Sequence, residues 1–110
     1  MSAAGGEPGV LRGEFTVPAD HPCLAGHFPA EPIVPAVLLL DLSCAELRRV
    51  APQFGPLREL RMAKFIRPVR PGETVRVSFI PASAAGSLRF TCETDAGVAA
   101  QGQMSFGTVP

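Results

Sequence analysis

The chain has 110 residues, of which 46% are hydrophobic and 18% charged, and its ten basic and ten acidic side chains leave no formal net charge at pH 7. This composition excludes intrinsic disorder, and the balanced charge argues against general affinity for nucleic acid. The length fits one domain that buries roughly 65% of its unfolded surface and is small enough to gain stability from a partner.

We expect residues 1–9 to form a flexible N-terminal tail and residues 10–110 to form the single domain. The tail lacks the basic start and apolar run of a signal peptide, and no apolar run in the chain approaches the ~20 residues of a membrane span. The three cysteines are widely spaced and odd in number, so reduced thiols are expected. These features together predict a cytoplasmic protein.

Residues 10–17 alternate between apolar and polar side chains, with Leu11, Phe15 and Val17 on one face, which predicts a half-buried strand. Residues 18–35 contain five prolines and are expected to form a stiff, extended loop that presents His27 in a defined place. His21, Cys23 and His27 lie within this region but lack the paired spacing of a zinc module. We therefore expect no metal site.

A helix is predicted over residues 36–50. Pro35 suits the start of a helix, and Arg48 and Arg49 suit the negative end, where Ala51 and Pro52 follow. All five residues from 36 to 40 are apolar, and apolar residues continue after Asp41. A helix that is apolar all round for nearly two turns is expected to be surrounded by protein.

Asp41 interrupts this apolar helix. No cation on the same helix can pair with its carboxylate, because its neighbours at three and four positions are apolar, namely Val37, Leu38, Cys44 and Ala45. A desolvated carboxylate without a partner tends to hold its proton, which makes Asp41 a candidate general acid. A structural role, with the carboxylate bonded to a loop amide or a distant arginine, is the alternative. A lone loop histidine such as His27 is also more often structural than catalytic.

Four further strands are predicted over residues 57–69, 73–81, 87–93 and from residue 98 onward. Turn signals at residues 71–72, 85–86 and 95–97 separate them. One strand, one buried helix and a four-strand meander predict an α+β domain, in which a single antiparallel sheet covers the helix with its concave face.

Two strings in the sequence resemble one known family. H-F-P-x-x-P-x-x-P-x-V-x-x-x-D at residues 27–41 is similar to the signature of the 3-hydroxyacyl-acyl-carrier-protein dehydratases, and A-K-F-x-x-P-V-x-P-G-E at residues 63–73 is similar to that family's other recurrent string. The resemblance implies the hot-dog fold, an antiparallel sheet wrapped around one central helix. It also implies dehydration of carrier-linked 3-hydroxyacyl thioesters to trans-2-enoyl thioesters, in fatty acid or related polyene biosynthesis.

The same resemblance implies roles for individual residues. His27 and Asp41 correspond to the catalytic pair, and the Ala36 amide at the helix N-terminus corresponds to the group that binds the thioester carbonyl. The matched strings also supply three expected substrate contacts, Phe28, Pro35 and Phe65. The resemblance implies no cofactor, and it implies a homodimer, or a larger assembly of dimers, with active sites at the interface.

The sequence departs from the family pattern at two positions of the helix. Ala36 stands where the family usually has glycine, and Ala45 stands where it usually has glutamine. The chain also lacks the leading helix and strand of the longer fatty-acid enzymes, and in this it is more similar to the short dehydratases of aryl-polyene pathways. Two alternatives stay open. A hot-dog thioesterase would need no histidine, and a non-catalytic acyl-binding or partner subunit would explain both alanines.

Basic residues are concentrated in the middle of the chain. Seven of the ten lie between residues 47 and 71, where only Glu59 opposes them. The cluster is either a solvated strand edge or a docking surface for an acidic partner, such as an acyl carrier protein with its phosphopantetheine-linked substrate. The expected carrier-binding residues are Arg58, Arg61, Lys64, Arg67 and Arg70.

Overall fold

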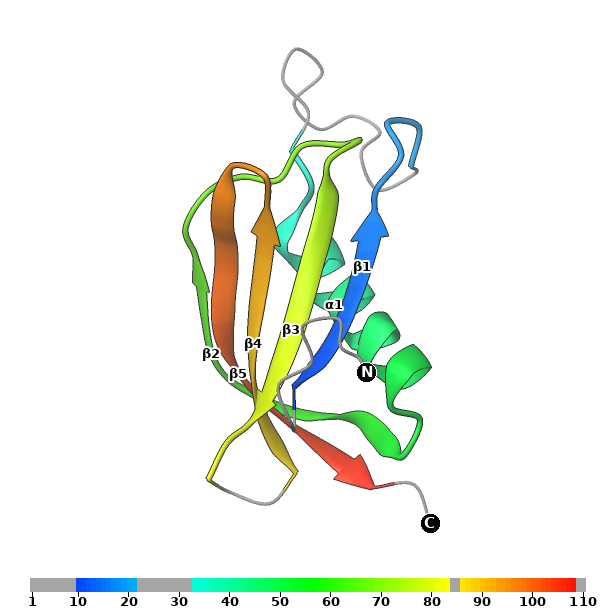
Figure 1. Cartoon of the computed structure of the whole chain (residues 1–110), viewed down its shortest axis with the longest axis vertical. Coiled ribbons are helices and arrows are strands. Elements are labelled where there is room, and N and C mark those ends of the chain that lie inside the picture. Colours follow the sequence, from blue (N-terminus) through cyan, green and yellow to red (C-terminus); the bar gives the residue numbers. More distant parts are fainter. Residues whose placement is uncertain (1–9, 22–32, 84–85, 109–110) are drawn as a thin grey trace.

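The computed structural model describes residues 10–21, 33–83 and 86–108, and the expected tail at residues 1–9 lies outside this part (Figure 1). The elements are β1 (Leu11–Thr16), α1 (Ala36–Val50), β2 (Phe54–Phe65), β3 (Thr74–Pro81), β4 (Ser87–Thr94) and β5 (Gly97–Thr108). Figure 1 shows α1 behind the sheet. No helix in the described residues is long and apolar enough to cross a membrane.

The strands form one five-stranded antiparallel sheet in the order β1-β3-β4-β5-β2. This confirms the predicted α+β arrangement of one sheet against one helix, but the predicted four-strand meander is wrong in one strand. β3, β4 and β5 follow one another, whereas β2 pairs with β5 and not with β3. The physical reason is that β1 already occupies the other edge of β3, from Leu11 opposite Phe79 to Thr16 opposite Thr74.

α1 begins and ends where the sequence predicts, but protein does not surround it. One face packs on the sheet through buried side chains, namely Leu38, Leu39, Ser43, Cys44 and Leu47. The opposite face is exposed, and the Val37 side chain is 79% accessible to solvent. A five-stranded sheet covers only one side of a helix, so the expectation of burial all round is wrong for the single chain.

The core lies between this helix face and the inner face of the sheet. Its largest fully buried side chains include Phe79, Phe90 and Met104 from three neighbouring strands, and Leu47 from α1. Each such side chain contributes roughly 1.5–3 kcal/mol by leaving water. The core therefore fixes how α1 sits on the sheet.

β2 starts three residues earlier than predicted and ends at Phe65 instead of Val69. Val69 does not extend the strand, because its carbonyl oxygen accepts a hydrogen bond from the Val34 amide at 2.7 Å. Pro68 also lacks the N–H that a strand ladder requires. The chain after Phe65 therefore leaves the ladder with β5 by Val69, where it bonds to the residue two positions before α1.

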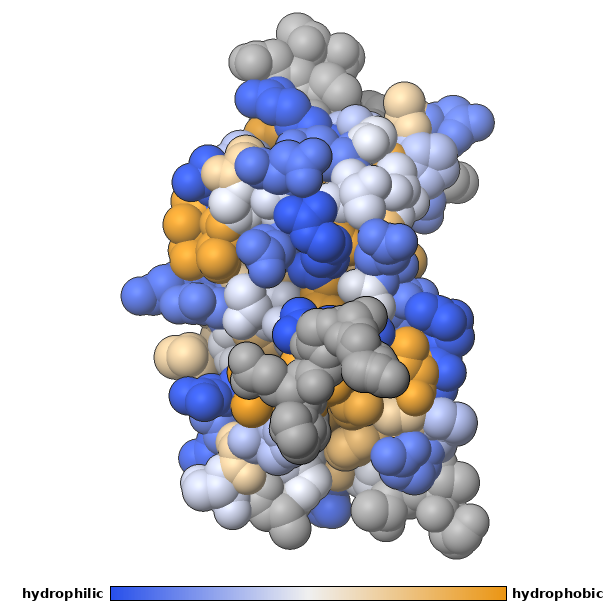
Figure 2. Space-filling view, viewed as in Figure 1, coloured by the Kyte–Doolittle hydropathy of each residue, from blue (hydrophilic) through white to orange (hydrophobic). Residues whose placement is uncertain are grey.

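β2 is an edge strand with exposed apolar side chains. Leu57, Leu60 and Phe65 are 41%, 41% and 46% accessible, and no other described strand pairs with the outer edge of β2. Figure 2 shows hydrophobic atoms at the left margin of the molecule, where β2 lies in Figure 1. Unpaired edges with apolar side chains are surfaces that a partner can cover.

Candidate active site

The described structure contains part of the predicted site. His27, the expected base, and Phe28 lie outside the described residues, as does Cys23. Asp41, Ala36, Pro35 and Phe65 are described. The site is therefore built here from the helix and from the segment that follows β2.

The N-terminus of α1 has backbone donors that no described side chain caps. Pro35 precedes the helix in an extended conformation with φ −60° and ψ 145°, and the first turn contains no acidic residue. The amide of Leu39 donates to the Pro35 carbonyl at 3.0 Å, which leaves the amides of Ala36, Val37 and Leu38 without a partner inside the helix. Such amides favour an oxygen atom that gains negative charge.

An apolar pocket of about 280 Å³ adjoins this helix end. The hydrogen bond from Val34 to Val69 joins the two sides of the pocket, and the amides of Ile66 and Arg67 both donate to the Ala99 carbonyl, at 2.8 and 3.3 Å. These bonds fasten the segment after β2 across the start of the helix. The pocket is lined by Ile33, Val34, Ala36, Leu39, Phe65, Ile66, Arg67, Pro68 and Val69.

The pocket brings together two residues that the sequence placed in separate strings, Ala36 and Phe65. Sequence reasoning missed Leu39 and Val69 as lining residues. Leu39 lies three positions after Ala36, and this spacing puts the two side chains on one helix face. Two features of the sequence could have identified these lining residues: the spacing of Leu39 from Ala36, and the position of Val69 inside the second string.

Asp41 lies on another face of α1, with Val37 one turn before it. The residue is exposed and does not line the pocket beside Ala36. The expected desolvation of Asp41 is therefore wrong for the single chain. Asp41 makes no hydrogen bond or ion pair with another described residue, so its carboxylate stays open to a partner or a substrate.

The other carboxylate on α1, Glu46, is engaged. Arg49 holds it through three contacts of 2.9 to 3.2 Å, and one of its oxygens accepts the Glu14 amide at 3.2 Å. The hydrogen bond from Arg49 lowers the pKa of Glu46. A carboxylate held in its ionised form is a poor proton donor, so Glu46 is not a candidate general acid.

The described cysteines do not form a nucleophilic site. Burial raises the pKa values of the Cys44 and Cys92 thiols, and a raised pKa disfavours the reactive thiolate. The Ser43 hydroxyl sits between helix and sheet, where it donates to the Leu39 carbonyl at 2.8 Å and lies 3.3 Å from the Cys92 sulfur. Within the described ranges, no group of His, Cys, Asp and Glu side chains is placed to hold a metal ion.

The predicted carrier-binding residues are all exposed, but they do not form one compact patch. Arg58 packs near Gly107, whereas the Arg67 guanidinium lies beside Gly97 and donates to the Val98 carbonyl at 3.3 Å. Gly97 and Gly107 are ten residues apart on one strand, a separation of roughly 33 Å. Only Arg67 among the five lines the pocket at the helix N-terminus.

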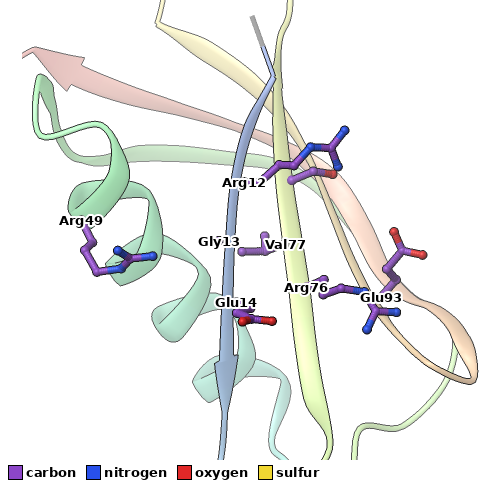
Figure 3. Close-up of a pocket in the computed structure, with 8 residues that line it drawn as sticks. Arg12, Gly13, Glu14, Arg49, Arg76, Val77 and Glu93 are labelled. Carbon is purple, nitrogen blue, oxygen red and sulfur yellow. The ribbon is translucent and has the colours of Figure 1, made fainter. Parts of the chain in front are cut away.

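A second hollow, of about 420 Å³, lies at the opposite edge of the sheet around Gly13 (Figure 3). Figure 3 shows Arg49 on α1 to the left of β1, and Arg76 and Glu93 to its right. Arg76 is bound to Asp95 at 3.1 Å, and Arg49 is bound to Glu46. Because both arginines already form ion pairs with carboxylates, we do not infer an anion-binding site in this hollow.

Comparisons with known proteins agree with the architecture and with the two sequence strings. The model of the ApeI-like family, described as ApeI dehydratase, matches residues 6–103. The chain is 40% identical over 80 residues to 3-hydroxyacyl-acyl-carrier-protein dehydratase FabZ of Chloroflexus aggregans, an alignment that covers 64% of this chain and 55% of that protein. The chain spans 55% of the length of that protein and 59% of the length of the FabZ dehydratase of Pasteurella multocida, to which it is 32% identical over 91 residues.

Solved structures share the fold. The dehydratase heterocomplex ApeI:P from Xenorhabdus doucetiae matches with a TM-score of 0.76 and 22% identity over 93% of this chain and 90% of that one. The fluoroacetyl-CoA-specific thioesterase FlK matches with a TM-score of 0.68 and 18% identity over 91% of each chain. The sheet wrapped around one helix is therefore the hot-dog fold, and the match over residues 6–103 shows that the chain belongs to the ApeI-like dehydratase family.

Proposed function

We propose that the protein dehydrates 3-hydroxyacyl thioesters carried on acyl carrier protein to trans-2-enoyl thioesters. One observation carries this proposal: α1 combines an N-terminus that no described side chain caps and an exposed carboxylate, Asp41. The family match and the FabZ relatives support the same reaction.

The proposed mechanism uses one base, one acid and one amide. Neutral His27 removes a proton from C2 of the substrate, and Asp41 gives a proton to the departing 3-hydroxyl, which leaves as water while the C2–C3 double bond forms. The Ala36 amide, at the positive end of the helix, stabilises the charge that develops on the thioester oxygen. The ordinary pKa of histidine, about 6.5, suits a base at neutral pH.

Two identical chains share each site in this proposal, so that His27 of one chain works with Asp41 of the other. The exposed apolar row on β2 and the exposed Val37 give a second copy a surface to cover. Asp41 lies outside the pocket at the N-terminus of its own helix, which also favours action in a partner's site. A different hot-dog subunit on the same edge is the second candidate, because the similar ApeI:P structure is a heterocomplex.

The carrier docks, in this proposal, on the basic residues of β2 and of the segment that follows it. The exposed Arg61 and Lys64 lie on the β2 edge, and Arg67 lies beside the pocket. Complementary charge of this kind speeds encounter with an acidic carrier.

Thioester hydrolysis is the competing activity, since the FlK thioesterase has the same fold. A short 3-hydroxyacyl thioester incubated with the protein distinguishes the candidates by its product. We expect an enoyl thioester, seen by its ultraviolet absorbance and mass. A free 3-hydroxy acid would instead identify a thioesterase. Unchanged substrate, whether linked to carrier or to coenzyme A, would support a non-catalytic subunit. Ala36 and Ala45, which replace residues usual in the family, are the sequence features that favour this last alternative.

A further inference from the structure

The pocket at the helix N-terminus has both exposed and buried lining residues. Its outer wall consists of exposed residues that include Phe65 and Ile66, whereas three buried side chains, Val34, Leu39 and Val69, belong to the hydrophobic core. Arg67 is the one charged residue in the described lining. A ligand that enters beside Ala36 therefore meets apolar side chains and then a floor that belongs to the core.

The chemistry of the lining favours the acyl chain over the pantetheine arm. Pantetheine carries two amides and hydroxyl groups, which lose hydrogen bonds to water when they enter an apolar pocket. An acyl chain gains free energy there, because its methylene groups leave water. Ala36 and Leu39 lie on one helix face, so a chain whose carbonyl is held by the Ala36 amide can run along α1 toward Leu39.

We infer that Leu39 is a specificity-determining residue that sets an upper limit on acyl length. Leu39 lies three residues after Ala36, which is about 4.5 Å of rise along the helix, so the floor lies close to the bound carbonyl. The inference rests on the proposed function, because it takes the acyl thioester to be the ligand, and it predicts short and medium acyl chains as substrates.

The test measures binding, so that its outcome does not depend on turnover. Pantetheine thioethers with 2-oxoalkyl chains keep the carbonyl oxygen but can be neither dehydrated nor hydrolysed. Calorimetry with chains of about four to sixteen carbons should show the dissociation constant falling by up to about fourfold for each added methylene, until the pocket is full. Once the chain reaches the floor, further methylenes should bring no gain in affinity.

Two variants move the expected limit and one serves as a matched control. Leu39→Ala removes three carbon atoms from the floor and should extend the limit by about three carbons, and Val69→Ala should extend it by about two. Leu38→Ala removes the same atoms from a buried neighbour outside the pocket and should leave the limit unchanged. Circular dichroism establishes that each variant is folded, and Val69→Ala keeps the test valid if Leu39→Ala unfolds.

An unchanged limit in the folded pocket variants would overturn the inference, as would affinity that does not depend on chain length in the wild type. The proposed function can fail separately. A length-dependent binding series that shifts in Leu39→Ala, in a protein that forms no enoyl product, would retain the acyl pocket and reject the dehydratase.

Discussion

Gly102 is the position where one added methyl group should do most harm to the sheet. It lies in β5, opposite Ala63 of β2 and Phe90 of β4. A Cβ atom there would lie 2.8 Å from the Phe90 ring atom Cε1 and 2.9 Å from the Met62 carbonyl carbon, and it would clash with the Met62 carbonyl oxygen. The obstacle includes backbone, so Gly102→Ala must displace β2 from β5.

The cost follows from this geometry. Overpacking a tight site costs typically about 1–3 kcal/mol, and a backbone obstacle places Gly102→Ala toward the upper end, about 2–3 kcal/mol. Near this chain length each kcal/mol lowers Tm by roughly 4–8 °C, so a fall of about 10 °C or more is expected. Gly107→Ala in the same strand is the control, since its nearest atom, Arg58 Cδ, lies 3.6 Å from the added methyl.

Urea and thermal unfolding followed by circular dichroism measure the difference. Both variants must be compared at one protein concentration, because an oligomer's Tm depends on concentration. If Gly102→Ala were as stable as Gly107→Ala, the close approach of β2 to β5 described here would be refuted. The pocket wall at Phe65 would then also need a different placement, because β2 carries it.

The remaining predictions concern the proposed site and its electrostatics. Asp41→Asn, which keeps the shape but loses the transferable proton, should lower kcat at least ~100-fold, and wild-type turnover in the folded variant would reject the acid role. Refolding His27→Ala together with Asp41→Ala should restore about a quarter of wild-type activity through mixed dimers, whereas no recovery despite subunit exchange would place both residues in one chain. Reversing the charges of Arg61 and Arg70 should raise KM for carrier-linked substrate more than for small thioesters, as added salt should, and an equal effect on both would leave only a solvated surface. Arg49 lowers the pKa of Glu46, so the stability that this carboxylate adds is present above its ordinary pKa of 4.5 and is lost as the pH falls through the lowered pKa. Urea melts of Glu46→Gln should therefore show a weaker loss of stability below pH 4.5 than the wild type, and an unchanged pH profile would contradict this.

Local chemistry in the sequence determined the elements that depend on neighbouring residues. The helix has the predicted bounds, because Pro35 sets its start and Pro52 follows its end. The alternation in β3 and β4 placed these strands to within one residue, since side chains in a strand alternate between two faces. The two sequence strings named the family without any structure, and the pocket brings residues of both strings together.

The tertiary structure alone decided which strand lies beside which and which surfaces stay open. A sequence pattern shows that β2 is a strand, but it does not show which strand β2 pairs with. β2 pairs with β5 because β1 occupies the free edge of β3, and the paired residues of β1 and β3 lie more than fifty positions apart in the sequence. The apolar pattern of α1 predicted burial but could not show that a single sheet leaves Val37 and Asp41 in solvent. Burial and charge clustering are properties of three-dimensional neighbours, and this is why seven cations that are close in sequence lie on α1, on β2 and in the segment after β2 instead of in one patch.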